Sequence, residues 1–266
     1  MLAARGCDAI CHAAALVSLW RRDAREFDSV NVGGLINALA AAREARLSRV
    51  VYTSSFLARP PAGARAPLRS NDYQRTKAAA LTIARQAQDA GAQLVITYPG
   101  VIYGPGILSD GNLVGRMLAQ HFAGRLPGLI GADRTWSYAW VEDVGAAHAA
   151  AVDHPSPEAE YELGGDNAPQ MRVFEIARRL RGSALPRRIP YRVAEAIGAL
   201  EECRARLTGT PPRLTRATVE IFRHDWPVGS DAARQDLGYA PPLLEEGLAR
   251  LIGIASSGPM PSNKTT

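Results

Sequence analysis

The stretch from residue 49 to residue 100 decides the fold, and it reads RVVYTSSFLARPPAGARAPLRSNDYQRTKAAALTIARQAQDAGAQLVITYPG. Its first residues, 49–55, are β-branched and aromatic and predict a strand, as do residues 93–98. Residues 71–90 between them predict a helix with Gly91 at its carboxyl end. A strand, a helix and a second strand in this order predict two parallel strands joined by a crossover helix.

The same alternation continues on both sides of this unit. Upstream, residues 8–14 predict a short strand, and the helical spacing of apolar residues over 25–47 predicts a crossover helix. Downstream, residues 141–152 predict a helix between two strands at 136–140 and 160–163. The fold class that this order predicts is α/β, with a doubly wound, Rossmann-like parallel sheet.

The chain changes character after about residue 170. Four helical segments joined by proline and glycine predict a small, mostly helical cap, and the polar last residues predict a disordered tail. The helical segments are 173–181, 193–207, 216–223 and 243–254. The predicted division is a partial dinucleotide-binding domain at 1–104 and 134–165, a substrate cap at 105–133 and 166–255, and a tail at 256–266.

Composition excludes several classes of protein. The 266 residues are 47% hydrophobic and 21% charged, which is typical of a globular chain and not of a disordered one. The net charge is +5, but the arginines are scattered, so we predict no nucleic-acid partner. No run approaches the ~18 apolar residues of a membrane helix, so we expect no spanning segment and a soluble, cytoplasmic protein. Residues 10–20 offer the alternative of a signal peptide, but no small-residue cleavage site follows them.

The metal-binding residue types are sparse. The three cysteines are an odd set, and Cys7 and Cys11 lack a second pair at zinc-ligand spacing, so we interpret them as small buried residues. The five histidines show no HExxH spacing. The sequence therefore predicts no metal site.

The strongest chemical signal is Tyr73 followed by Lys77, with Ser55 at the end of the preceding predicted strand. Positions i and i+4 share one face of a helix, and strand ends open onto the ligand crevice of a parallel sheet. A neighbouring ammonium is expected to lower the pKa of the Tyr73 phenol. The pair would then exchange a proton with an alcohol or carbonyl oxygen that the Ser55 hydroxyl also binds.

The choice of lysine in this pattern is informative. Only two of the 31 basic residues are lysines, Lys77 and Lys264, and the second lies in the predicted tail. Arginine is no substitute for a compact ammonium that tunes a phenol and binds ribose hydroxyls. A lysine at the one position that this chemistry needs favours a catalytic role over an ordinary surface helix.

These residues and several others resemble the extended short-chain dehydrogenases/reductases of the NAD-dependent epimerase/dehydratase superfamily. The chain is most similar to the dihydroflavonol-reductase-like branch, and within it to farnesol dehydrogenase-like proteins of plants. The motifs that carry the resemblance are His12–Ala14, Asn31–Gly34, Tyr52–Ser55, Tyr73 with Lys77, Tyr98–Gly106, Trp136 with Val141–Val144, and Tyr161–Gly165.

The resemblance implies catalytic roles for three residues. Tyr73 would be the acid and base, Lys77 would bind the nicotinamide ribose and tune Tyr73, and Ser55 would hold the substrate oxygen. Glu142 and Asp143 form a pair of carboxylates, but in this family their segment is structural, and we adopt that interpretation.

The resemblance also implies a cofactor site, for NAD or NADP. Ala13 and Ala14 would line its adenosine side, Thr53 would lie beside it, and Pro99 to Val101 would contact the carboxamide. Asn31 is similar to a helix asparagine that supports the site, and a purely structural role inside its helix is an equal alternative.

One part of the family pattern is missing. The family normally opens with a strand, a glycine-rich turn that holds the pyrophosphate, a helix and further strands, whereas this sequence starts near the family's third helix. We therefore expect an incomplete sheet with its first strands missing, an N-terminally truncated chain, weak dinucleotide binding and an exposed edge at residues 8–14. Targeting to an organelle cannot be read from such an N-terminus.

The predicted function is hydride transfer between a nicotinamide cofactor and an alcohol or carbonyl substrate, farnesol-like or dihydroflavonol-like, impaired in this chain. One alternative is a nucleotide-sugar epimerase or dehydratase, although the largely apolar residues 107–130 favour an alcohol substrate. Another is a non-catalytic cofactor sensor or scaffold. A homodimer would form through the two long helices, 25–47 and 71–90.

Overall fold

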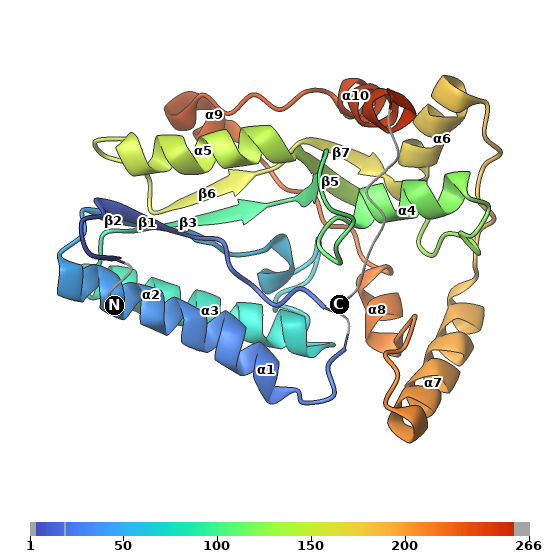
Figure 1. Cartoon of the computed structure of the whole chain (residues 1–266), viewed down its shortest axis with the longest axis horizontal. Coiled ribbons are helices and arrows are strands. Elements are labelled where there is room, and N and C mark those ends of the chain that lie inside the picture. Colours follow the sequence, from blue (N-terminus) through green and yellow to red (C-terminus); the bar gives the residue numbers. More distant parts are fainter. Residues whose placement is uncertain (1–3, 19, 258–266) are drawn as a thin grey trace.

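A four-stranded parallel sheet forms the centre of the computed structural model, which describes residues 4–18 and 20–257 (Figure 1). The strand order is β1-β2-β3-β6, so β1 lies at one edge. Each strand pairs in parallel with its neighbour, as the sequence predicts. The strands are β1 (Ala9–His12), β2 (Arg49–Thr53), β3 (Leu94–Pro99) and β6 (Glu160–Leu163).

Helices cover both faces of this sheet, which confirms the α/β class. Figure 1 shows α2 (Gly34–Ala45) and α3 (Asp72–Asp89) side by side on one face, and α5 (Val141–Asp153) on the other. Every residue of β3 is buried because the strand lies between two neighbours and two helical layers. The core between the sheet, α2 and α3 includes Leu35, Tyr52 and Ile96, each at most 1% exposed.

A second, three-stranded sheet extends from the carboxyl end of the first. It has the order β4-β5-β7, in which β5 pairs in parallel with β4 and antiparallel with β7. Only Gly100 separates β3 from β4, and a Cβ at that position would lie 2.7 Å from the Ser137 carbonyl oxygen. The strands are β4 (Val101–Tyr103), β5 (Thr135–Trp140) and β7 (Asp166–Pro169).

Most of the remaining helices lie around this second sheet and beyond it, whereas α9 packs against α5 and β6 of the first sheet (Figure 1). A large apolar core joins the sheet to α4, α6 and α10 and contains Trp136, Phe174 and Leu248. The helices are α4 (Leu113–Phe122), α6 (Gln170–Arg181), α7 (Tyr191–Thr208), α8 (Arg216–Ile221), α9 (Asp231–Leu237) and α10 (Leu244–Ser257).

The predicted helix at 25–47 is not uniform. It consists of α1 (Arg25–Phe27), a π-helical segment η2 (Asp28–Gly33) and then α2. π-helical hydrogen bonding is rare and widens the helix by one residue per turn. Gly33 ends this segment and Gly34 begins α2, and both have ordinary right-handed helical dihedral angles.

Several sequence predictions need correction. The sequence indicated neither α4 nor α9, because both are short helices in a chain region rich in glycine and proline. Residues 256 and 257, predicted as tail, belong to α10, and the rest of the predicted tail lies outside the described residues. Cys7 and Cys11 are exposed, not buried. The edge position of β1 agrees with the exposed edge predicted there.

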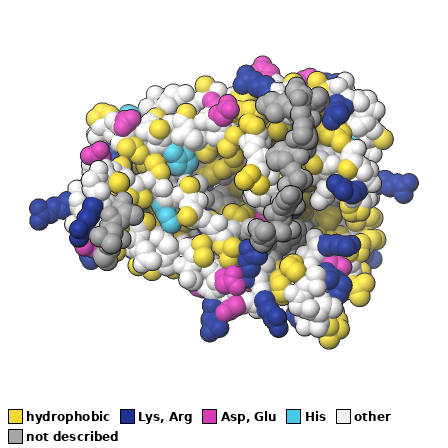
Figure 2. Space-filling model, viewed as in Figure 1, with side chains coloured by type: hydrophobic (Ala, Val, Ile, Leu, Met, Phe, Trp, Pro, Cys, Tyr) yellow, Lys and Arg dark blue, Asp and Glu magenta, His cyan; other side chains and the backbone are white. Residues whose placement is uncertain are grey.

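The surface charge and the hydropathy of the helices can be described for the part of the chain that the structure covers. On the face drawn in Figure 2, basic side chains are spread around the rim among acidic ones instead of gathering in one patch. Across residues 4–18 and 20–257, no helix is both long and apolar enough to cross a membrane.

Candidate active site

The structure places Ser55 and the first turns of α3 together beyond the carboxyl end of β2. Ser55 is 6% exposed and caps the short helix η3 (Phe56–Ala58), since its hydroxyl accepts a bond of 3.2 Å from the Leu57 N–H. Asn71 caps α3 by accepting a bond of 2.8 Å from the Gln74 N–H. These two caps fix where β2 ends and where α3 begins.

Tyr73 lies beside Ser55, as the sequence predicts. The Ser55 hydroxyl lies close enough to the Tyr73 phenol to lower the pKa of the phenol, but burial has the larger effect and raises it. The expected lowering by Lys77 is therefore wrong for this structure, because desolvation outweighs any stabilisation of the phenolate. At neutral pH the phenol keeps its proton.

Lys77 is the most deeply buried charged group of the site. It is 3% exposed, and its ammonium donates a hydrogen bond of 2.8 Å to the Thr53 carbonyl oxygen. The ammonium also lies 5.1 Å from the centre of the Tyr52 ring, a cation–π contact. Burial lowers the pKa of Lys77 to about 8.

Thr53 belongs to two networks at once. Its carbonyl binds Lys77, while its hydroxyl lies 2.8 Å from Nε2 of His148 on α5, across the sheet. The Thr97 hydroxyl lies 3.0 Å from the same nitrogen, and Nδ1 of His148 lies 2.7 Å from the Val144 carbonyl. His148 therefore connects α5 to side chains of both β2 and β3. The sequence did not indicate this role.

The other predicted cofactor residues occupy the same edge of the sheet. Ala13 and Ala14 follow β1 directly and are exposed. Pro99 ends β3, and Val101, which is 7% exposed, begins β4. Their places at carboxyl strand ends fit the crevice in which α/β sheets bind ligands.

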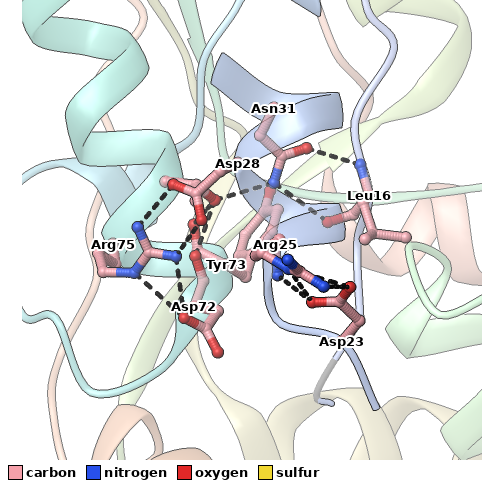
Figure 3. Close-up of polar contacts among 9 residues, drawn as sticks. Leu16, Asp23, Arg25, Asp28, Asn31, Asp72, Tyr73 and Arg75 are labelled. Atoms are coloured by element: carbon pink, nitrogen blue, oxygen red, sulfur yellow. Dashed lines mark hydrogen bonds and ion pairs between the residues drawn. The ribbon is translucent and has the colours of Figure 1, made fainter. Parts of the chain in front are cut away.

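Asn31 has polar partners that the sequence could not show. It is 2% exposed, and its amide nitrogen donates to the Thr76 hydroxyl at 3.0 Å. Figure 3 shows the same side chain bonded to the backbone of Leu16, whose N–H donates to Oδ1 at 2.7 Å. Asn31 thus joins the loop after β1 to the helix that carries Tyr73.

The residues present fit the ribose end of a nicotinamide dinucleotide. Of the three N–H bonds of Lys77, the described residues supply an acceptor for one, which leaves donors for ribose hydroxyls. Nearby, Nε2 of the buried His12 and the hydroxyl of the buried Ser54 have no hydrogen-bond partner among the described residues. Buried polar atoms of this kind cost free energy unless a ligand or water binds them.

Other features lie outside this constellation. A cavity of about 580 Å³ lies between the carboxyl ends of α4 and α6 and has none of the predicted site residues in its wall. Glu142 accepts a bond of 3.2 Å from the Trp140 indole, which supports its structural interpretation. Within the described residues, no group of histidine, cysteine or carboxylate side chains is arranged to hold a metal ion.

Comparisons with known proteins agree with this geometry. The model of the NAD dependent epimerase/dehydratase family matches residues 1–164. A 2-alkyl-3-oxoalkanoate reductase of Stenotrophomonas maltophilia (strain K279a) is 30% identical, over 94% of this chain and 81% of its own length. A 4-hydroxy-2-methyl-3-oxo-4-farnesyl-3,4-dihydroquinoline-1-oxide ketoreductase of Stigmatella aurantiaca is 32% identical, over 96% and 80%. The crystal structure of gox2253 superposes with a TM-score of 0.76, at 25% identity over 96% and 80%.

The fold and the match to these reductases define an enzyme of the oxidoreductase class. The chain belongs to the NAD-dependent epimerase/dehydratase family. The predicted family and class of reaction are thereby confirmed, and the cofactor is a nicotinamide dinucleotide.

Proposed function

We propose that this chain reduces the carbonyl group of an apolar substrate to an alcohol, with Ser55, Tyr73 and Lys77 as its catalytic residues. The observation that carries the proposal is the Tyr73 phenol beside the buried Ser55, on the helix whose next turn carries the buried Lys77. NAD(H) or NADP(H) supplies or accepts the hydride when bound, and the protein handles the proton. Ala13, Ala14, Thr53, Pro99 and Val101 would form the rest of the cofactor site.

The proton path follows from the geometry. In reduction, the Tyr73 O–H donates its proton to the carbonyl oxygen as hydride reaches the carbon, and Ser55 donates a hydrogen bond to the same oxygen. In oxidation, the phenolate takes the hydroxyl proton as the hydride leaves. Because burial raises the pKa of Tyr73, the protonated form that reduction requires prevails at neutral pH.

The apolar substrate is supported by two observations. The two relatives are named as reductases of an alkyl-substituted 3-oxoalkanoate and of a farnesyl-bearing ketone. In this chain, α4 and its surroundings contribute apolar residues such as Leu113 and Met117 to the core around the second sheet. We propose a ketone with a long alkyl or isoprenoid group. We also propose that the cap is residues 105–133 and 166–255, as predicted.

Substitution of Tyr73 tests the proposal. Tyr73→Phe removes the proton donor while keeping the ring, so the rate of ketone reduction should fall by roughly 10²- to 10⁴-fold. The rate is measured from the absorbance of the reduced cofactor with a 2-alkyl-3-oxoalkanoate and a farnesyl-bearing ketone as substrates. Tyr191→Phe, a matched change in α7, serves as control. Equal rates for Tyr73→Phe and the unchanged chain would contradict the proposal, and turnover of a UDP-sugar instead of both carbonyls would favour an epimerase.

A further inference from the structure

An ion-pair cluster behind the proposed site joins α3 to the π-helical segment η2. The Arg75 guanidinium donates two hydrogen bonds of 2.7 Å to the two carboxylate oxygens of Asp28. It also donates to one Asp72 oxygen, at 3.1 and 3.0 Å (Figure 3). Two parallel bonds to one carboxylate fix direction as well as distance, which a lysine could not do.

Arg75 itself faces away from the chemistry. It lies two positions from both Tyr73 and Lys77, which is about 200° around the helix from each. Its side chain is 40% exposed and that of Asp28 48%, and ion pairs this exposed add little to the free energy of unfolding. Stability is therefore a weak explanation for a four-bond cluster at this place.

Geometry offers a better explanation, because Asp28 is the first residue of η2 and Asn31 lies three residues later in the same segment. The segment is held against α3 at two points: Asp28 binds Arg75, and Asn31 binds Thr76, the next residue of α3. If η2 relaxed to α-helical hydrogen bonding, residues on its two sides would rotate by about 100° relative to one another. Such a rotation would take the Asn31 amide away from its partners.

Asn31 in turn holds the loop after β1. Its side chain bonds both the N–H and the carbonyl of Leu16, two residues beyond Ala14. The segment η2 thus connects two sets of polar contacts: Asp28 binds Arg75 on α3, and three residues later Asn31 binds both Thr76 on α3 and this loop, which lies at the carboxyl edge of the sheet.

We infer that Arg75 and Asp28 are positioning residues, which hold η2 in its π-helical form and so set the loop after β1 relative to Tyr73 and Lys77. The inference deepens the proposed function, and its catalytic part rests on that proposal. Its structural part concerns this chain alone. Neither residue touches the reacting groups.

Arg75→Met tests the inference, with Arg85→Met as matched control. Arg85 is on the same helix and also binds a carboxylate, Glu160, at 2.6 and 2.9 Å. Amide hydrogen exchange by NMR is the first readout. We expect about tenfold faster exchange of the Leu16 amide and of residues 32–34 in Arg75→Met, and no selective change there in Arg85→Met. Arg75→Lys, which keeps charge but loses the fork, should resemble Arg75→Met.

Kinetics supply the second readout. Arg75→Met should lower kcat by about tenfold and change KM for the ketone less than twofold, because misplacement affects the transition state more than binding. Unchanged exchange at Leu16, or equal effects in the Arg75 and Arg85 variants, would overturn the inference. The exchange result does not depend on turnover, so a failure of the proposed function appears separately, as an inactive chain or an active Tyr73→Phe variant.

Discussion

Lys77 carries its charge in a place where only 3% of the residue reaches solvent. The hydrogen bond to the Thr53 carbonyl and the contact with the Tyr52 ring compensate part of the hydration that the ammonium loses. The pKa of Lys77 is lowered because the rest of that loss is not compensated. An amine with a pKa of about 8 is still mostly protonated at neutral pH. It can therefore donate to ribose hydroxyls under physiological conditions.

Lysine-selective ¹³C labelling checks this pKa directly, because the chain has only two lysines, Lys77 and Lys264. We expect one of the two ¹³Cε signals to titrate near pH 8 and to vanish in Lys77→Met. Two signals that both titrate above pH 10 would mean that Lys77 is solvated in solution.

The same group affects stability with a defined sign. Between about pH 8 and pH 10.5 the unfolded chain holds the Lys77 proton and the folded chain does not, so stability rises with pH through this window. The free energy of unfolding of the unchanged chain, minus that of Lys77→Met, should rise by about 2–3 kcal/mol over this window. Urea unfolding at several pH values measures the difference, and a flat difference would refute the prediction.

His148 gives a prediction at acid pH. Burial lowers its pKa below the ordinary 6.5, so as pH falls below 6.5 the unfolded chain takes up a proton that the folded chain refuses, and stability falls. His12 and His121 are shifted in the same direction, so the whole chain should lose stability in acid. His148→Gln should reduce the slope of unfolding free energy between pH 6.5 and pH 5. A slope equal to that of the unchanged chain would rule out His148.

At the residue scale, local sequence patterns could predict the positions of the proposed catalytic residues but not their surroundings. Tyr73, Lys77 and Ser55 were found because a four-residue spacing and a strand end are local patterns. The direction of the Tyr73 pKa was predicted wrongly, since burial depends on atoms distant in sequence. The partners of Asn31, and Asp28 as a partner of Arg75, lie 15 to 47 positions away, and no local pattern indicates them.

At the scale of elements, strands and long helices were predictable because apolar periodicity reports burial directly. The division of the strands into two sheets was not, because it depends on how the chain turns at single glycines. Gly100 separates β3 from β4, and Gly164 with Gly165 separates β6 from β7. Each pair of strands is consecutive in sequence but belongs to different sheets.

Gly165 therefore offers a sharp test of this junction. A Cβ at Gly165 would overlap the carbonyl oxygen of Tyr138 on β5, a backbone atom in a paired strand that cannot move aside. Gly165→Ala should lower the free energy of unfolding by about 3 kcal/mol or more, as overpacking against backbone does. Gly145→Ala in α5, where a Cβ meets nothing within 4 Å, is the control. Similar thermal midpoints for the two variants would contradict the close approach.

At the scale of the whole molecule, the layer formed by α2 and α3 carries apolar side chains that are exposed to solvent. Figure 1 shows the two helices forming one face of the molecule, with no further layer outside them. Ile36 of α2 is 47% exposed and Val30 of η2 is 40% exposed. Burial of such side chains against a second copy would stabilise a dimer by about 25 cal/mol per Å² of apolar surface. The predicted homodimer through the two long helices uses this face.

Ile36→Asp distinguishes that face from other exposed apolar sites. A carboxylate placed at the centre of a helix-to-helix interface loses its hydration without a partner, so the variant should be monomeric where the unchanged chain is dimeric. Leu207→Asp on α7, where the leucine is 82% exposed, is the matched control and should keep the dimer. Light scattering after size exclusion gives the mass of each. If Leu207→Asp gives monomers and Ile36→Asp does not, the interface is on α7. The contacts that join η2 to α3 would then lie away from the interface, within each subunit.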